Sequence, residues 1–83
     1  HSGHPEFRVG GKIFATLGPA GDWGMTRLPP KSQASFVDSN PDVFGPAAGA
    51  WGRQGCTIIQ LRKAKKAQVS LALRLAWEHT APR

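Results

Sequence analysis

A pair of glycines, Gly10-Gly11, separates two runs of strand-forming residues near the start of the chain, Glu6–Val9 and Lys12–Leu17. Two consecutive glycines can take positive φ at both central positions of a type I′ turn. The sequence therefore predicts a β-hairpin here. Within the second arm, apolar side chains alternate with polar or aromatic ones, so one face of this arm is expected to be apolar and the other mixed.

Turn-forming residues divide the rest of the chain into short segments. A third strand after the hairpin would complete an antiparallel meander, and Pro29-Pro30 would end that strand and begin a helix. In the loop after this helix, Val43 and Phe44 are expected to anchor the chain. The expected segments are a strand Trp23–Leu28, a helix of about Pro30–Ser39, a loop 42–50, an extended segment near Ala50-Trp51, a strand Cys56–Leu61 and a helix of about Lys65–His79.

The last expected helix carries two apolar stripes. One follows helical spacing and is expected to pack on the sheet; it consists of Val69, Ala72, Leu73, Ala76, Trp77 and Thr80. The second stripe, Leu71 and Leu75, lies on roughly the opposite side, with Ala64 and Ala67 nearby. Either another segment or another chain covers this stripe, or the two leucines are ordinary exposed surface residues.

All of the net charge of +6 can be assigned to the stretch Val43–Trp77, because the charges before and after it cancel. This stretch contains no acidic residue. Its cations are Arg53, Arg62, Lys63, Lys65, Lys66 and Arg74. A basic half joined to a neutral half indicates a polyanionic partner such as nucleic acid, and it is equally compatible with a basic surface that has no partner. A membrane surface is disfavoured, because the sheet needs the main apolar stripe of the helix.

Size and composition exclude several classes of protein. A chain of 83 residues makes one small domain. The single cysteine, Cys56, excludes an internal disulfide and a zinc cluster of several thiolates, which fits a reducing, cytoplasmic setting. The carboxylates are scattered and no serine has a nucleophile-elbow context, so we expect neither an enzyme nor a cofactor. His1 and His4 lack the further ligands of a metal site.

Four blocks of the sequence carry a resemblance to a known family. They are Gly3–Leu17 (GHPEFRVGGKIFATL), Trp23-Gly24-Met25, Gly49–Gly55 (GAWGRQG), and Ala76-Trp77 followed by Ala81-Pro82. In this order and spacing they resemble the blocks of the MmcQ/YjbR-like family, over nearly the whole chain. The resemblance implies a compact α+β domain of the CyaY-like type and the family's label of DNA-binding protein. We therefore expect an antiparallel sheet of about five strands with helices packed on one face.

The chain departs from the family pattern in two places. Members of the family usually have a helical segment before the Gly-His-Pro block, so we expect a single domain over residues 1–83 that lacks this N-terminal helix. The family is also acidic or mixed where this chain has Lys63, Lys65 and Lys66. Cations at a helix N-terminus oppose the helix dipole, and a phosphate bound there would relieve that cost.

The segment Gly52–Gly55 has two interpretations. It resembles glycine-flanked loops that approach nucleic-acid phosphates, with Arg53 as a donor and Trp51 as a stacking platform. Alternatively, it is a tight turn with Trp51 in the core.

The sequence thus predicts a domain that binds DNA or another polyanion, mainly through nonspecific phosphate contacts by the basic half. The alternatives are a non-catalytic interaction or homodimerisation module that uses the Leu71/Leu75 stripe, and a small-molecule pocket lined by Trp23, Phe36 and Trp51.

Overall fold

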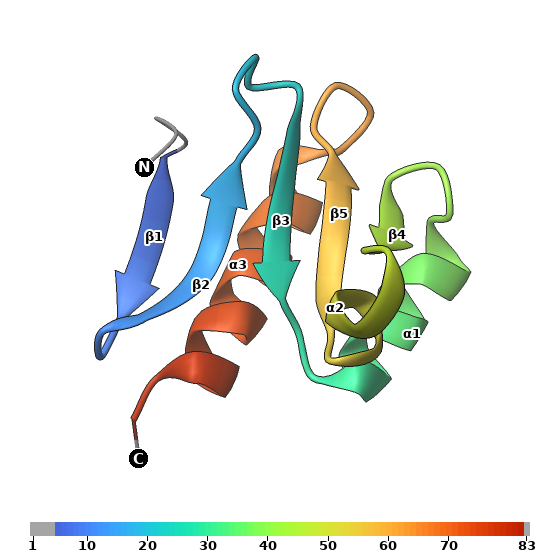
Figure 1. Cartoon of the computed structure of the whole chain (residues 1–83). Helices are drawn as coiled ribbons and strands as arrows, with labels where there is room; N and C mark the ends of the chain where they lie inside the picture. Colours follow the sequence, from blue (N-terminus) through green and yellow to red (C-terminus); the bar gives the residue numbers. More distant parts are fainter. Residues whose placement is uncertain (1–4, 83) are drawn as a thin grey trace.

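A computed structural model describes residues 5–82 of the chain. Its five strands form one open antiparallel sheet in the order β1-β2-β3-β5-β4, accompanied by three helices (Figure 1). The predicted α+β fold is confirmed. The elements are β1 (Glu6–Val9), β2 (Lys12–Leu17), β3 (Trp23–Arg27), α1 (Pro30–Ser39), β4 (Phe44–Pro46), α2 (Gly49–Arg53), β5 (Cys56–Gln60) and α3 (Lys66–Thr80).

The predicted hairpin is present between β1 and β2. Gly10 and Gly11 both have positive φ, 57° and 80°, as a type I′ turn requires. The pairing is irregular farther along, because the register steps from Phe7 opposite Ala15 to Arg8 opposite Ile13. The intervening residue of β2, Phe14, has no partner on β1, so it forms a β-bulge, a feature that bends a strand and re-aims its side chains.

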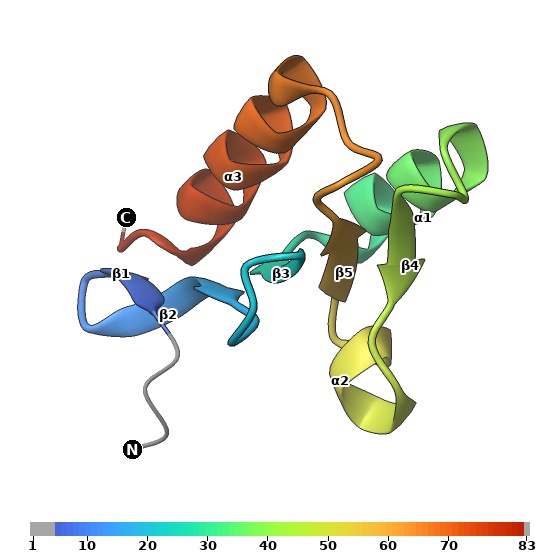
Figure 2. The ribbon, with the colours of Figure 1, turned by 90° about the horizontal axis from the view of Figure 1, so that it is seen from above.

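The two longer helices, α1 and α3, lie on one side of the sheet, and the short helix α2 lies on the other side near β4 and β5 (Figure 2). Two contacts bring Gly55 and the start of β5 close to other segments. Gly55 has φ of 105°, and its backbone meets that of Leu28, whose N–H donates to the Gly55 carbonyl at 2.9 Å. The Gln33 side-chain amide of α1 donates to the Cys56 carbonyl at 3.0 Å, which ties α1 to the start of β5.

The core lies between the sheet and the two longer helices. Val43 and Phe44 are both buried, so their predicted role as anchors is confirmed. The ring of Phe44 packs against Phe36 of α1 with a centroid distance of 4.7 Å, and its backbone pairs with Ile59 of β5. These contacts join α1, β4 and β5 around one apolar cluster, which Ala72 of α3 closes.

The segment 42–50 differs from its prediction as a loop. Residues 44–46 form β4, and the predicted extended segment near Ala50-Trp51 is wrong, because these residues belong to α2. The reasons are not local. β4 exists because β5 supplies its hydrogen-bonding partners, and the helical turn is possible because Gly52 has no Cβ, which would collide with the carbonyl oxygen of Ala47.

The buried face of α3 is narrower than predicted. Ala72 and Ala76 are fully buried, and Val69, Leu73 and Thr80 are half-buried, but 48% of Trp77 is exposed. At 100° per residue, Trp77 lies about 120° around the helix from the line midway between the two alanines. The prediction that Trp77 belongs to the packing face was therefore wrong. The small alanines at the centre of that face pack against the sheet, and a side chain about 120° away from them points largely to solvent.

Candidate nucleic-acid interface

Four cations gather in the connection between β5 and α3, where a tight turn brings them together. The N–H groups of Lys63 and Ala64 both donate to the Gln60 carbonyl at 3.0 Å, so the chain reverses directly after β5. All four cationic side chains are exposed, and none has an ion-pair partner within residues 5–82. We call this surface the basic corner; it consists of Arg62, Lys63, Lys65 and Lys66.

The basic corner coincides with the N-terminus of α3. Lys65 occupies the N-cap position, where its side chain cannot accept a hydrogen bond because an ammonium group has only donors. Gln68 accepts from the Lys65 N–H at 2.7 Å, and the first turn holds no acidic residue. Backbone donors without an intrahelical partner and several cations therefore occur at the same end of α3, which favours a bound anion.

A shallow hollow of about 490 Å³ borders the basic corner. Lys63 and Lys65 line it, as does the acidic residue Asp42. Asp42 forms no ion pair with either lysine. Its carboxylate lowers the positive potential on this side. Arg62 and Lys66 do not line this hollow.

The remaining predicted residues lie elsewhere, so the predicted set does not form one surface. Arg53 and Trp51 belong to α2, before the start of β5, whereas the basic corner follows its end (Figure 1). A strand of this length separates its two ends by roughly 15 Å. Arg74 is on α3, about 12 Å along the axis from Lys66. The six cations, which no acidic residue interrupts in the sequence, thus lie in three separate places.

Trp51 is 67% exposed, so its alternative placement in the core is wrong. It lines a hollow of about 600 Å³ over the sheet, on the side away from α1 and α3. We call this the sheet hollow. Its principal side chains are Arg8, Lys12, Phe14, Met25, Arg27 and Trp51.

Sequence reasoning missed the cations of the sheet hollow, because they belong to the half of the chain whose charges cancel. The available signal was the mixed face of β2, where aromatic and polar residues alternate with the apolar ones. On β3, Met25 and Arg27 repeat this arrangement, since residues two apart in a strand share a face. Antiparallel pairing between Thr16 and Met25 then places these two mixed faces side by side.

The Leu71/Leu75 stripe borders a third hollow, of about 580 Å³, between α1 and α3. Phe36 of α1 and Ala67 of α3 also line it. Leu71 is 42% exposed and Leu75 is half-buried. The stripe is therefore present as an apolar wall of a groove rather than as scattered surface leucines.

The alternative of a small-molecule pocket formed by Trp23, Phe36 and Trp51 is wrong. Phe36 faces the groove between α1 and α3, and Trp51 lines the sheet hollow on the other side of the sheet. The sheet itself separates these two rings, so they cannot share a ligand.

Cys56 is buried at the start of β5. Burial raises the pKa of its thiol, and the nearby Arg27 guanidinium opposes that shift only partly, so the thiol is neutral near pH 7. No group of three or more His, Cys, Asp or Glu residues suited to a metal ion occurs within residues 5–82, and His1 and His4 lie outside these residues. In the same part of the chain, every helix is too short or too polar to cross a membrane.

No protein-family model, curated protein or solved structure matches this chain. The resemblance to the MmcQ/YjbR-like family therefore stays an expectation that depends on the sequence blocks, and function must be argued from the surfaces described above.

Proposed function

We propose that this domain binds nucleic acid through its basic corner, with phosphate contacts that carry little base specificity. The observation that supports the proposal is the clustering of four exposed cations within residues 62–66, without an ion-pair partner in residues 5–82, at the N-terminus of α3. The proposal involves no catalytic step and no cofactor.

Phosphate contacts explain why the binding would be nonspecific. The basic corner consists of long, exposed lysine and arginine side chains, which reach the backbone oxygens common to every sequence. If all four cations contact phosphates, the logarithm of the affinity for duplex DNA should fall with the logarithm of salt concentration with a slope of roughly −3.6. Arg53 and Arg74 are not part of this cluster, so this slope counts only the four cations of the basic corner.

The decisive variant replaces Lys63, Lys65 and Lys66 by Gln. We expect its affinity for a labelled 16-base-pair duplex to fall on the order of 10²-fold at 50 mM salt, and the salt slope to flatten by about 2.7. Fluorescence anisotropy at several salt concentrations measures both quantities.

The matched control is the triple variant Lys31→Gln, Arg53→Gln, Arg74→Gln, which removes the same charge away from the basic corner. It should lose much less affinity. If the two triple variants lose affinity equally, net charge rather than the corner is responsible, and if the wild-type protein fails to bind duplex at low salt, the proposal is wrong.

A second candidate function is a protein-interaction or homodimerisation module that uses the Leu71/Leu75 stripe. The groove between α1 and α3 supports it, because the apolar side chains of Phe36, Leu71 and Leu75 all border solvent there. Burying such surface in an interface would be favourable by about 25 cal/mol per Å².

Sedimentation tests this second candidate. A concentration-dependent dimer that becomes monomeric in Leu71→Asp is the expected result, because a carboxylate in an apolar interface is costly to desolvate. The control is Ser70→Asp, which adds the same charge at an exposed position of the same helix and should leave the dimer intact. A monomer at every concentration would contradict homodimerisation.

A further inference from the structure

We propose that the sheet hollow is a second binding site, which takes an unpaired nucleotide of single-stranded nucleic acid. It shares no residue with the basic corner and is lined by β1, β2, β3, Trp51 and the first residue of β5, whereas the basic corner follows the last residue of β5, so it does not depend on the proposed duplex binding. Its ligand is identified by two features of the hollow, a positive charge for the phosphate and two aromatic rings, of which Trp51 is exposed, for the base.

The charge comes from three neighbouring strands. Arg8 of β1, Lys12 of β2 and Arg27 of β3 line the hollow, and no acidic residue lines it. Cys56, which also lines it, is neutral because burial raises the pKa of its thiol. The hollow is therefore cationic although these strands come from the half of the chain without net charge, which favours an anionic group such as a phosphate.

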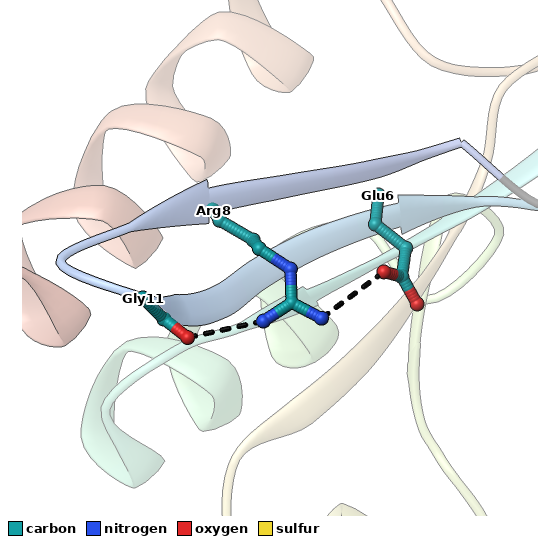
Figure 3. A network of polar contacts seen from close by, with 3 residues as sticks. All are labelled: Glu6, Arg8 and Gly11. Atoms are coloured by element: carbon teal, nitrogen blue, oxygen red, sulfur yellow. Dashed lines mark hydrogen bonds and ion pairs between the residues drawn. The ribbon is translucent and has the colours of Figure 1, made fainter.

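One of the three cations is held in position by its neighbours. The Arg8 guanidinium donates to the Gly11 carbonyl at 3.0 Å and to the Glu6 carboxylate at 3.3 Å (Figure 3). A guanidinium has five N–H donors, so donors remain for a ligand after these two contacts. Glu6 offsets part of the charge of Arg8. Of the three cations that line the sheet hollow, Lys12 and Arg27 have no ion-pair partner in residues 5–82.

The aromatic component comes from Trp51 and Phe14. Trp51 exposes 67% of its surface over the hollow, more than any other large apolar residue described here. Phe14 is the bulged residue of β2, which has no partner on β1. Bulges re-aim side chains next to binding sites, and bases stack on exposed aromatic rings with little sequence preference. Met25 adds an adaptable apolar side chain to the lining of the hollow.

This combination favours a single strand over a duplex. In a duplex the bases are stacked inside, and the duplex presents mainly phosphates and groove edges, so an aromatic ring that lines a hollow cannot stack on the bases. An unpaired base can enter the hollow while its phosphate stays at the cationic rim. A volume of about 600 Å³ is adequate for such a ligand, since ligand sites of about 300–1,000 Å³ are usual.

Anisotropy of dye-labelled pentanucleotides, dT5 and rU5, tests the proposal with the full chain. We expect saturable binding at 50 mM salt, about tenfold weaker in Trp51→Ala, with part of the affinity retained in Trp51→Phe because a ring is still present. Arg27→Gln should weaken binding about fivefold to tenfold and reduce the salt slope by roughly 0.7. Circular dichroism of each variant verifies that it is folded, as expected for substitutions of exposed residues.

Two controls match these variants. Trp77→Ala removes a similarly exposed tryptophan from α3, and Lys31→Gln removes an exposed cation from α1, so neither should change pentanucleotide binding. The Lys63, Lys65 and Lys66 triple variant separates the two proposals, because it should lose duplex affinity and keep pentanucleotide affinity within about twofold. The proposal is overturned if pentanucleotides do not bind at 50 mM salt, if Trp51→Ala and Arg27→Gln bind like wild type, or if only the triple variant loses the pentanucleotide.

Discussion

Replacing Gly55 by alanine is expected to remove a large part of the stability of the domain. Gly55 has φ of 105°, which L-amino acids rarely adopt, and an added Cβ would collide with the backbone oxygen of Leu28. Relieving the collision requires the start of β5 to move away from the end of β3. We expect a loss of at least about 3 kcal/mol, from a total of roughly 4–12 kcal/mol for a chain of this size. Urea unfolding monitored by tryptophan fluorescence measures it.

Two other glycines separate the causes of this loss. Gly21 has φ of 73° but no atom near an added Cβ, so Gly21→Ala reports the cost of the backbone conformation alone, about 1–2 kcal/mol. Gly45 has neither restriction, and Gly45→Ala should change stability by less than about 1 kcal/mol. A Gly55→Ala variant as stable as Gly21→Ala would mean that the close approach to Leu28 does not exist.

Phe44→Ala should produce the other large loss, of about 3–5 kcal/mol. Only 1% of Phe44 is exposed, and its ring fills the space among α1, β4 and β5. Truncation leaves a cavity and removes the contact with Phe36 at 4.7 Å. Because β4 depends on this packing and on pairing with β5, its amide protons should also lose protection from hydrogen exchange. Thermal unfolding and hydrogen exchange measure the two effects.

Phe7 provides the control for Phe44. It lies on the edge strand β1 and is 45% exposed, so Phe7→Ala should cost less than about 1.5 kcal/mol. Equal losses for the two substitutions would indicate that the β1 edge is packed more tightly than described, or that the Phe44 cluster is not the centre of the core.

The basic corner was accessible to sequence analysis because its residues are close together in the chain. Any turn between β5 and α3 keeps Arg62 near Lys66, so the cluster survives whatever the rest of the fold does. Extending the interface to Arg53, Trp51 and Arg74 required knowing the path of the chain. The length of β5 separates α2 from the basic corner, and the rise of α3 separates Arg74 from Lys66.

The secondary structure also divides into elements that depend on neighbouring residues, which the sequence predicted, and elements that depend on distant segments, which it did not. The Gly10-Gly11 hairpin, the helix Pro30–Ser39 and the start of α3 next to Lys65 were predicted closely, because glycines, prolines and helical spacing act within a few residues. β4 was missed, since a three-residue segment of Phe, Gly and Pro has weak strand propensity and depends on its partner β5. α2 was missed because it depends on the contact between Gly52 and Ala47.

The sequence by itself determined the hairpin, the two long helices and the position of the basic corner, because each depends on interactions between neighbouring residues. Only the tertiary structure decided which cations share a surface. It separated Arg53 from the lysines that follow it and joined Arg8, Lys12 and Arg27 beside the exposed ring of Trp51. The physical reason is that side chains on adjacent strands meet through sheet register, which depends on hydrogen bonds between distant segments and leaves no signal in local charge.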